Sequence, residues 1–181
     1  MEASAMNPCA FRIFSEDFSL EALHEALDQQ RRARGLSWAG ATGEINRFKT
    51  SGHPIAISTI TGLKKKAAGE GDGILQMLLW LCRTPESFVP GFVDAEAERF
   101  QLRQVHVEQT LRWDAKALHA ALNAQREAGG MTWSQVAQEL GGFTSAMLTN
   151  LANGGRVGLP GVMRIVGWLG RPAATFTRVA D

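Results

Sequence analysis

The chain has 181 residues, of which 45% are hydrophobic and 20% charged, and its formal net charge is +1. This is the composition of an ordinary globular protein, and the small net charge argues against a protein that coats nucleic acid indiscriminately. No apolar run approaches the roughly 18 residues of a membrane span, and residues 1–18 lack the basic start and apolar stretch of a secretory signal. We therefore expect a cytoplasmic protein that does not enter a membrane.

The chain contains an internal repeat. Residues 19–45, moved forward by 95 positions, meet residues 114–140 without a gap, and 11 of these 27 positions are identical. Further along, Trp80 meets Trp168 at an offset of 88, so the first copy carries seven extra residues (95 − 88 = 7), which fall within residues 47–54. A repeat of about 90 residues exceeds the roughly 20 to 50 residues of solenoid units and indicates a duplicated small domain.

The first helix of each copy is marked at both ends. Ser19 and Asp114 stand at equivalent positions, where a hydroxyl or carboxylate accepts a hydrogen bond from the first turn of a helix. Gly35 and Gly130, also equivalent, stand where helices commonly end on a glycine with left-handed backbone angles. We therefore expect one helix between each cap and its glycine.

A second helix follows directly in each copy. Its expected N-caps are Ser37 and Thr132, and in the second copy Gln135 stands where it completes a capping box with Thr132. We expect this helix to end near Ile45 in the first copy and near residues 141–142 in the second.

Two more helices and a final short turn complete each copy. Apolar residues three apart predict a short third helix over residues 57–66 and 145–153, with one narrow inward stripe. A fourth helix, over residues 73–82 and 161–170, is apolar nearly all round and is expected to form the core. Thr84, which precedes a proline, then predicts the start of a last short helix.

The cysteines and histidines do not indicate a reactive centre. Cys9 and Cys82 occupy unmatched places in the two copies, so we expect free thiols, with Cys82 buried, rather than a disulfide or metal ligands. His24 and His119 recur at one place, which favours a shared packing or surface role over metal or proton chemistry. No nucleophile, acid-pair or phosphate-loop signature is present, so we expect no enzyme activity, cofactor or metal.

These patterns divide the chain into four parts. We expect the linker to be partly helical over residues 94–103, with Phe100, Leu102 and Val105 packed against one domain. The predicted parts are an N-terminal arm (1–18), a first domain (19–90), a linker (91–112) and a second domain (113–181).

The repeat unit resembles a known family. Short helices with a Gly-Leu-Ser or Gly-Met-Thr junction between the first two, and a Trp-Leu pair near the end of the fourth, resemble the Cro and phage-repressor type of helix-turn-helix domain, also called XRE. The stretch Phe-Thr-Ser-Ala-Met-Leu-Thr-Asn-Leu-Ala-Asn-Gly at residues 143–154 is the most similar, and the resemblance covers residues 19–88 and 114–176. It implies an all-α fold of two tandem five-helix lambda-repressor-like helix-turn-helix domains.

The resemblance also implies binding to double-stranded DNA. Domains of this type place the third helix in the major groove and the N-terminus of the second helix against a phosphate. Base contacts usually come from the first two residues of the third helix and from one residue a turn later. Carried over to this chain, the expected DNA-binding residues are Ser37, Trp38, Ile57, Ser58, Thr61, Lys64, Lys65 and Lys66 in the first copy, and Thr132, Trp133, Ser145, Ala146, Thr149, Asn150, Asn153 and Arg156 in the second.

The two copies are expected to contribute differently. Asn150 is the best candidate reader, because an amide binds adenine through two hydrogen bonds. The equivalent Gly62 has no side chain to read a base. The first copy is therefore expected to supply mainly phosphate contacts, from residues 64–66, with Ile57 placed to touch a thymine methyl group.

Two departures from the family pattern concern the first two helices. Trp38 and Trp133 stand where the family often has a glutamine that donates to a phosphate; an indole N–H is also a donor, and core packing is the equal alternative. Arg31 and Arg126 lack the glutamate of the third helix with which family members pair them. We expect them to find Glu44 or Glu139 instead, one in each copy.

A third departure is the insertion within residues 47–54 of the first copy. Because it lies between the second and third helices, it either displaces the third helix from its groove geometry or adds phosphate contacts from Arg47, Lys49 and His53.

Two kinds of function remain open. The first is a sequence-specific DNA-binding protein, a transcriptional regulator whose two domains do what two protomers of a repressor dimer do. The alternative is a protein-interaction module, antitoxin-like or part of a larger assembly, that keeps the fold but has reduced or lost DNA binding in one copy. The sequence leaves a homodimer or a protein partner open, and it does not reveal the target site.

Overall fold

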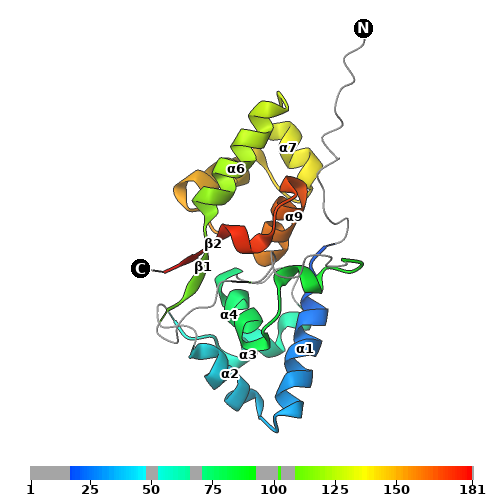
Figure 1. Ribbon diagram of the computed structural model, residues 1–181, viewed down its shortest axis with the longest axis vertical. Helices are drawn as coiled ribbons and strands as arrows, with labels where there is room; N and C mark the ends of the chain where they lie inside the picture. Colours follow the sequence, from blue (N-terminus) through cyan, green and yellow to red (C-terminus); the bar gives the residue numbers. More distant parts are fainter. Residues whose placement is uncertain (1–16, 48–52, 66–70, 93–101, 103–108, 181) are drawn as a thin grey trace.

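The computed structural model describes residues 17–47, 53–65, 71–92, 102 and 109–180. Over these residues the chain is mostly helical, with a small antiparallel sheet (Figure 1). No helix among them is long and apolar enough to cross a membrane.

The helices fall into two sets that follow one another along the chain, one in the lower and one in the upper part of Figure 1. The first set consists of α1 (Leu20–Ala33), α2 (Trp38–Asn46), α3 (Ile57–Thr61), η2 (Leu63–Lys65), α4 (Gly71–Leu81) and η3 (Pro85–Phe88). The second set consists of β1 (Leu111–Trp113), α6 (Ala115–Ala128), α7 (Trp133–Leu140), α8 (Ser145–Asn150), η4 (Leu151–Asn153), α9 (Leu159–Leu169), η5 (Ala173–Phe176) and β2 (Thr177–Val179). Apart from the strands, the order of elements is the same in both.

The expectation of a purely α-helical chain is wrong in one place. Strand β1 pairs antiparallel with β2, with Leu111 opposite Val179 and Trp113 opposite Thr177. Leu111 and Trp113 are buried and Arg112 between them is only partly so. The strands hold the two ends of the second set together, and three residues are too few to reveal a strand by alternation in the sequence.

The predicted helix ends are confirmed. The side chains of Ser19 and Asp114 accept hydrogen bonds from the third residue of α1 and of α6, at 3.0 and 2.9 Å. Gly35 and Gly130 have φ angles of +63° and +61°, so a side chain there would be strained. Thr132 forms the full capping box at the start of α7.

The third helices lie where the sequence places them, but each is divided. α3 and α8 are short α-helices, and each leads into a single 3₁₀ turn, η2 or η4. Lys66, which the prediction included, lies outside the described residues.

Equivalent tryptophans anchor the fourth helix of each set to the second helix. Trp80 on α4 donates from its indole Nε1 to Glu44 at 2.8 Å, and Trp168 on α9 donates to Glu139 at 2.7 Å. The two rings are only 6% and 3% exposed, as predicted. Each of these bonds gives a polar atom of a buried ring the partner that it requires.

Further hydrogen bonds recur at the repeat offsets. All of them join the first helix of a set to a later element of the same set. They run from the Ser19 amide to the Phe88 carbonyl, from the Asp114 amide to the Phe176 carbonyl, from the Gln30 side chain to the Trp80 carbonyl and from the Gln125 side chain to the Trp168 carbonyl.

The expected pairing of Arg31 with Glu44 is wrong. Arg31 folds back along α1 to Asp28 and donates to the carbonyl of Leu36 at 2.9 Å. Glu44 instead accepts hydrogen bonds from the indole of Trp80 and the guanidinium of Arg34. These two hydrogen bonds lower the pKa of the Glu44 carboxyl group.

Arg126 does not pair with Glu139 either. It donates to Asn123 at 2.8 Å and to the carbonyl of Met131 at 2.8 Å, while Glu139 accepts from Trp168. An arginine in the last turn of a helix reaches the side chain three residues before it and the carbonyl of the following turn without crossing to another helix.

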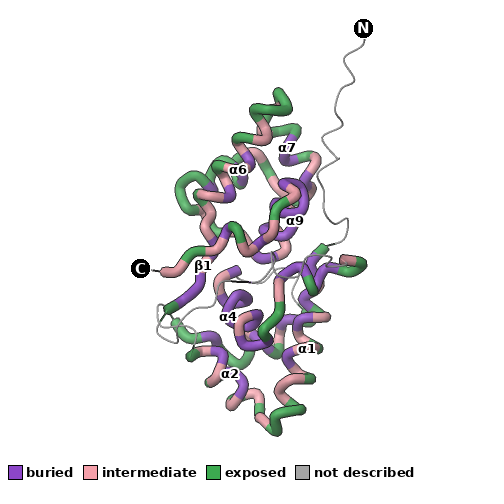
Figure 2. Tube along the Cα trace, viewed as in Figure 1, coloured by how far each residue is buried: buried purple, intermediate pink, exposed green. Residues whose placement is uncertain are grey.

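Helix α4 joins the two sets. It packs against α9 and against β1, and nearly all of its residues are buried, as the purple tube at the centre of Figure 2 shows. Asp72 accepts from the amide of Trp113 at 3.0 Å, and the buried side chain of Gln76 donates to the carbonyl of Leu111 at 2.8 Å. Polar groups of α4 thus fix the strand that leads into the second set.

A buried carboxyl group makes a second link between the sets. Glu86 on η3 is 0% exposed and accepts a hydrogen bond from the amide of Ala173 on η5 at 2.6 Å. A buried polar group of this kind needs a hydrogen-bond partner. The contact therefore fixes how the ends of the two sets meet.

The expectation that Cys82 is buried is wrong. It is exposed and has a φ of +52°, in the left-handed region that Gly170 occupies at the end of α9 with a φ of +65°. Cys82 lies just after the end of α4, and the apolar residues that precede it in the sequence do not indicate that its side chain is exposed. Of the linker residues expected to pack inward, Leu102 is buried; Phe100 and Val105, like most of the predicted linker helix and Cys9, lie outside the described residues.

We predict that Trp168→Ala lowers the free energy of unfolding by about 3 to 5 kcal/mol, because it leaves a cavity in the core and removes a donor from Glu139. Chemical denaturation followed by circular dichroism measures this. Trp133→Ala is the control, since that ring is only half-buried and its loss is expected to cost less. Equal losses in both variants would contradict the assignment of Trp168 to the core.

Candidate nucleic-acid interface

The outward side of α8 and η4 is an uncharged surface. Its exposed residues line a shallow hollow. Leu148 and Leu151 point the other way and are 0% and 2% exposed, so they hold the element to the core. We call this surface the α8 face, and it consists of Ala146, Met147, Thr149, Asn150 and Asn153.

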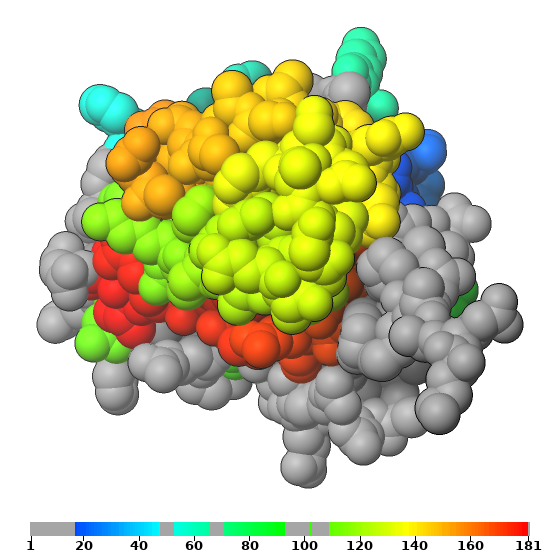
Figure 3. Space-filling view, turned by 90° about the horizontal axis from the view of Figure 1, so that it is seen from above, coloured from blue at the N-terminus to red at the C-terminus, as the bar shows by residue number. Residues whose placement is uncertain are grey.

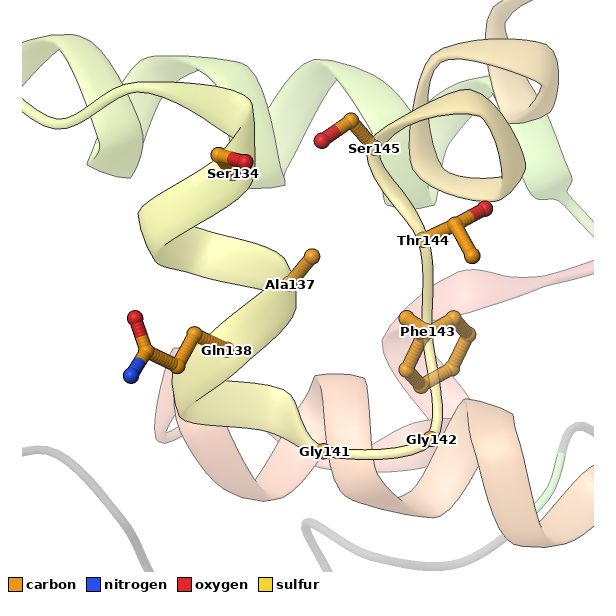
Figure 4. A pocket seen from close by; sticks show the side chains of 8 residues that line it. All are labelled: Ser134, Ala137, Gln138, Gly141, Gly142, Phe143, Thr144 and Ser145. Carbon is orange, nitrogen blue, oxygen red and sulfur yellow. The ribbon is translucent and has the colours of Figure 1, made fainter.

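Four residues turn the chain from α7 into α8. Gly141 and Gly142 have φ angles of +65° and +71°, and Thr144 caps α8 by accepting from the amide of Met147 at 3.2 Å. Figure 4 shows Ser134, Ala137 and Gln138 of α7 on one side of a hollow, with Thr144 and Ser145 across it. The start of α8 is therefore open to a ligand that approaches both helices.

An arginine of α9 holds this turn in place. Arg164 donates to the carbonyl of Gly141 at 3.0 Å and, through two other nitrogens, to the carboxylate of Asp17 at 2.7 and 2.6 Å. The hydrogen bonds that the guanidinium donates to Asp17 raise the pKa of Arg164. A side chain at Gly142 would collide with Arg164. Asp17, which precedes the first set, thus helps to position the turn in the second.

The corresponding turn of the first set contains the insertion, and there the chain just before α3 is held by Asn46 rather than by an arginine. The side chain of Asn46 donates to the carbonyl of Ile55 at 3.0 Å and accepts from its amide at 2.8 Å. Ile60 and Leu63 are 0% and 1% exposed, like their equivalents in α8 and η4. The insertion therefore leaves α3 packed by the same two inward residues.

The other predicted contacts of the insertion are only partly described. Arg47 and His53 are exposed, whereas Lys49 lies outside the described residues.

The outward side of α3 and η2 carries the remaining predicted residues. Ile57 is 43% exposed, and Ser58 and Thr61 are exposed beside it. Lys64 and Lys65 are exposed on η2, and Lys64 Nζ lies 3.8 Å from Glu25. A solvent-exposed ion pair at this distance is weak, so the lysine is available to a phosphate.

Trp38 and Trp133 pack on the first helix of their own set. Each ring is half-buried, with the guanidinium of Arg31 or Arg126 at 4.7 or 5.1 Å from its centroid. A histidine lies against each ring as well, at 5.4 and 5.2 Å between centroids, and these are the recurring His24 and His119. The predicted packing role of the histidines is confirmed, and the tryptophans are neither core residues nor free side chains.

The N-termini of α2 and α7 lie at the surface. Ser37 accepts from the amide of Gly40 at 3.1 Å and Thr132 from that of Gln135 at 3.3 Å. Each cap satisfies one of the four N–H groups that a helix leaves without an intrahelical partner at its start. The remaining groups suit a phosphate oxygen.

Figure 3 shows the second set from above, with orange residues, which include η4 and the loop after it, near one edge of the view, while a few cyan and turquoise residues of the first set project from behind the second set. Arg156 is exposed in the loop after η4. Every predicted residue except Lys66 lies in the described part of the chain, and all of these but Trp38, Trp133 and Ser145 are exposed.

Met147 was not among the residues predicted for this surface. It is 50% exposed on the α8 face, although a methionine beside Leu148 suggests a core residue. The signal was its position three residues before Asn150, which puts both side chains on one side of a helix.

Comparison with models of protein families, with curated proteins and with solved structures gives no significant match. Among the described residues, no group of three His, Cys, Asp or Glu side chains is arranged to hold a metal ion.

We predict that Lys64→Met raises the pKa of His24. Burial lowers this pKa below its usual value, the positive charge of Lys64 lowers it further, and the carboxylates of Asp28 and Glu25 raise it. Removing the charge of Lys64 takes away one of the two effects that lower the pKa. NMR titration of the ring protons measures the shift. Lys65→Met is the matched control, and a His24 pKa that responds equally to both variants would contradict the position of Lys64.

Proposed function

We propose that the chain is a sequence-specific DNA-binding protein, a transcriptional regulator that uses two tandem lambda-repressor-like helix-turn-helix domains, residues 19–90 and 113–181. The observation that carries the proposal is the recurrence, at the repeat offsets, of one order of helices with the same caps and the same internal hydrogen bonds. In each set, the turn after the second helix leads into a short helix, α3 or α8, whose outward side is exposed and does not contribute to the core. The proposal includes no catalytic step and no cofactor.

In the second domain, α8 acts as the recognition helix. A helix that enters the major groove needs an outward side of short or flexible polar groups, and its contacts with base edges come mainly from its first turns. Thr149 Oγ1 donates to the carbonyl of Ser145 at 3.1 Å, which leaves the amide of Asn150 as the exposed group suited to a base edge. The capped start of α7 lies across a hollow from the start of α8 (Figure 4) and suits a phosphate.

In the first domain, α3 and η2 contribute mainly contacts to the DNA backbone, which position the protein on the duplex. Gly62 stands where Asn150 stands in the second domain and offers no side chain. Lys64 and Lys65 supply positive charge next to it, and phosphate contacts fix the register of a protein on the duplex without reading its sequence. Ile57 is exposed and suits a thymine methyl group.

A second candidate function has one observation in its favour. The α8 face carries no charge, and Met147 exposes half of its surface there, as in surfaces that bind another protein. Under this alternative the second domain is a protein-interaction or antitoxin-like module, and only the first domain retains contact with DNA.

Selection from a pool of random DNA duplexes tests the proposal. The full chain is expected to enrich a defined site, and Asn150→Ala is expected to relax base preference within that site. Gln29→Ala, an exposed change on α1, is the control. Enrichment of no sequence by the unaltered chain would overturn the proposal.

DNA affinity is predicted to fall with salt, because each neutralised phosphate releases counterions. Replacing Lys64, Lys65 and Lys66 together by methionine should lower the magnitude of the salt slope by up to about three phosphate contacts and leave the sequence preference largely intact. Affinity measured over a salt series checks this. A slope that does not change would mean that these lysines do not contact DNA.

The preferred site is predicted to be asymmetric, because the two recognition helices differ. The half read by α8 should show the sharper base preference, and Asn150→Ala should weaken that half by about 1 to 3 kcal/mol and leave the other half unchanged. Binding to duplexes with one altered half at a time measures this. A perfectly palindromic site would instead indicate a dimer that reads DNA with one domain of each chain.

A further inference from the structure

We infer that the α8 face reads A·T base pairs, with Met147 against the methyl group of a thymine and Asn150 on an adenine. The inference rests on the proposed function and adds the base chemistry of one half of the site. It also makes Met147 a specificity-determining residue.

Met147 is an exposed apolar side chain that can contact an apolar group of a ligand. The side chain is 50% exposed although its neighbour Leu148 is fully buried, and only Ile57 is a comparably exposed large apolar residue among those that the structure describes. Both lie on the short helices that face outward, α8 and α3. Because the core is filled by Leu148 and Leu151, Met147 contributes little to it, and its thioether is free to cover an apolar group that docks on α8.

The chemistry around Met147 discriminates between base pairs. In the major groove thymine presents a methyl group, adenine an acceptor and a donor side by side, and guanine two acceptors that pair best with arginine or lysine. None of the nine residues 145–153 is charged. The α8 face instead offers three methyl-bearing side chains, Ala146, Met147 and Thr149, and the amides of Asn150 and Asn153. This set fits thymine and adenine and lacks the partner that guanine prefers.

The positions of Met147 and Asn150 allow both contacts at once. They are three residues apart, so their side chains lie one above the other on the same side of the helix. Gly155 leaves room for the amide, since a side-chain carbon there would lie 2.8 Å from Asn150 Nδ2, and its own amide donates to the Asn150 carbonyl at 3.1 Å. Gly155 is therefore a positioning residue for the amide.

The first set lacks both groups. At the offset of 88 residues, Thr59 replaces Met147 and Gly62 replaces Asn150, and Thr59 is half-buried. The paired contacts of a thymine methyl group and an adenine are thus expected in one half of the site only, since the first set offers Ile57 for a methyl group but no amide for an adenine. This contrast provides an internal control for the experiment.

The test uses the full chain and the duplex that it selects. Replacing each thymine in turn by deoxyuridine removes only the methyl group. At one position of the half read by α8 we expect affinity to fall about fourfold, as for loss of one buried methyl group. Met147→Ala should abolish that difference, and Met147→Leu should retain it. Replacing adenine by 7-deazaadenine should weaken binding of the unaltered chain and have no effect on Asn150→Ala.

Each outcome decides a different question. A selected site with G·C pairs under α8, or deoxyuridine effects that Met147→Ala leaves in place, would overturn the inference and leave the proposed function standing. Absence of any sequence-selective binding would overturn the proposed function itself. Unchanged DNA affinity in Met147→Ala, together with loss of self-association on a sizing column, would assign Met147 to a protein contact instead. Unchanged thermal unfolding of Met147→Ala shows that the variant is folded.

Discussion

The packing of α4 against α9 is the contact on which the arrangement of the whole chain depends. Both helices are apolar on nearly every side, so neither set of helices can cover its own fourth helix, and burial of the remaining surface favours contact between the sets. The hydrogen bond that Gln76 donates to Leu111 and the one that Glu86 accepts from Ala173 then fix the alignment that apolar packing alone leaves free. Because these donors and acceptors are buried, any sliding of one set on the other breaks bonds that water cannot replace.

Helix α9, which forms this junction, also contacts the turn that leads into the candidate site. Arg164 lies on α9 and holds both the turn before α8 and Asp17, which precedes α1. The shape of the turn in one set therefore depends on a residue that belongs to the start of the other. Duplication by itself would give two independent units, whereas here the turn that leads into α8 is held in part by a residue from the first half of the chain.

The features that the sequence predicted well are local ones. Caps at Ser19 and Asp114 and the left-handed Gly35 and Gly130 depend on a few neighbouring residues, and the repeat showed each of them twice. What it did not predict depends on contacts between distant segments. The β1 and β2 strands form because the two ends of the second set meet, and the partners of Glu44 and Glu139 were decided by buried indoles rather than by charge. The exposure of Met147 was hidden because Leu148 already fills the core.

The link between the two sets within one chain has a consequence for dosage. A regulator assembled from two separate protomers loses its second recognition helix when it is diluted below the dissociation constant of the dimer, so occupancy of its site rises with more than the first power of protein concentration. Under the proposed function, the α4 and α9 junction would keep α3 and α8 at a fixed effective concentration relative to each other, however little protein is present. Occupancy of a DNA site would then follow a simple hyperbola, which gives a graded response in place of a threshold.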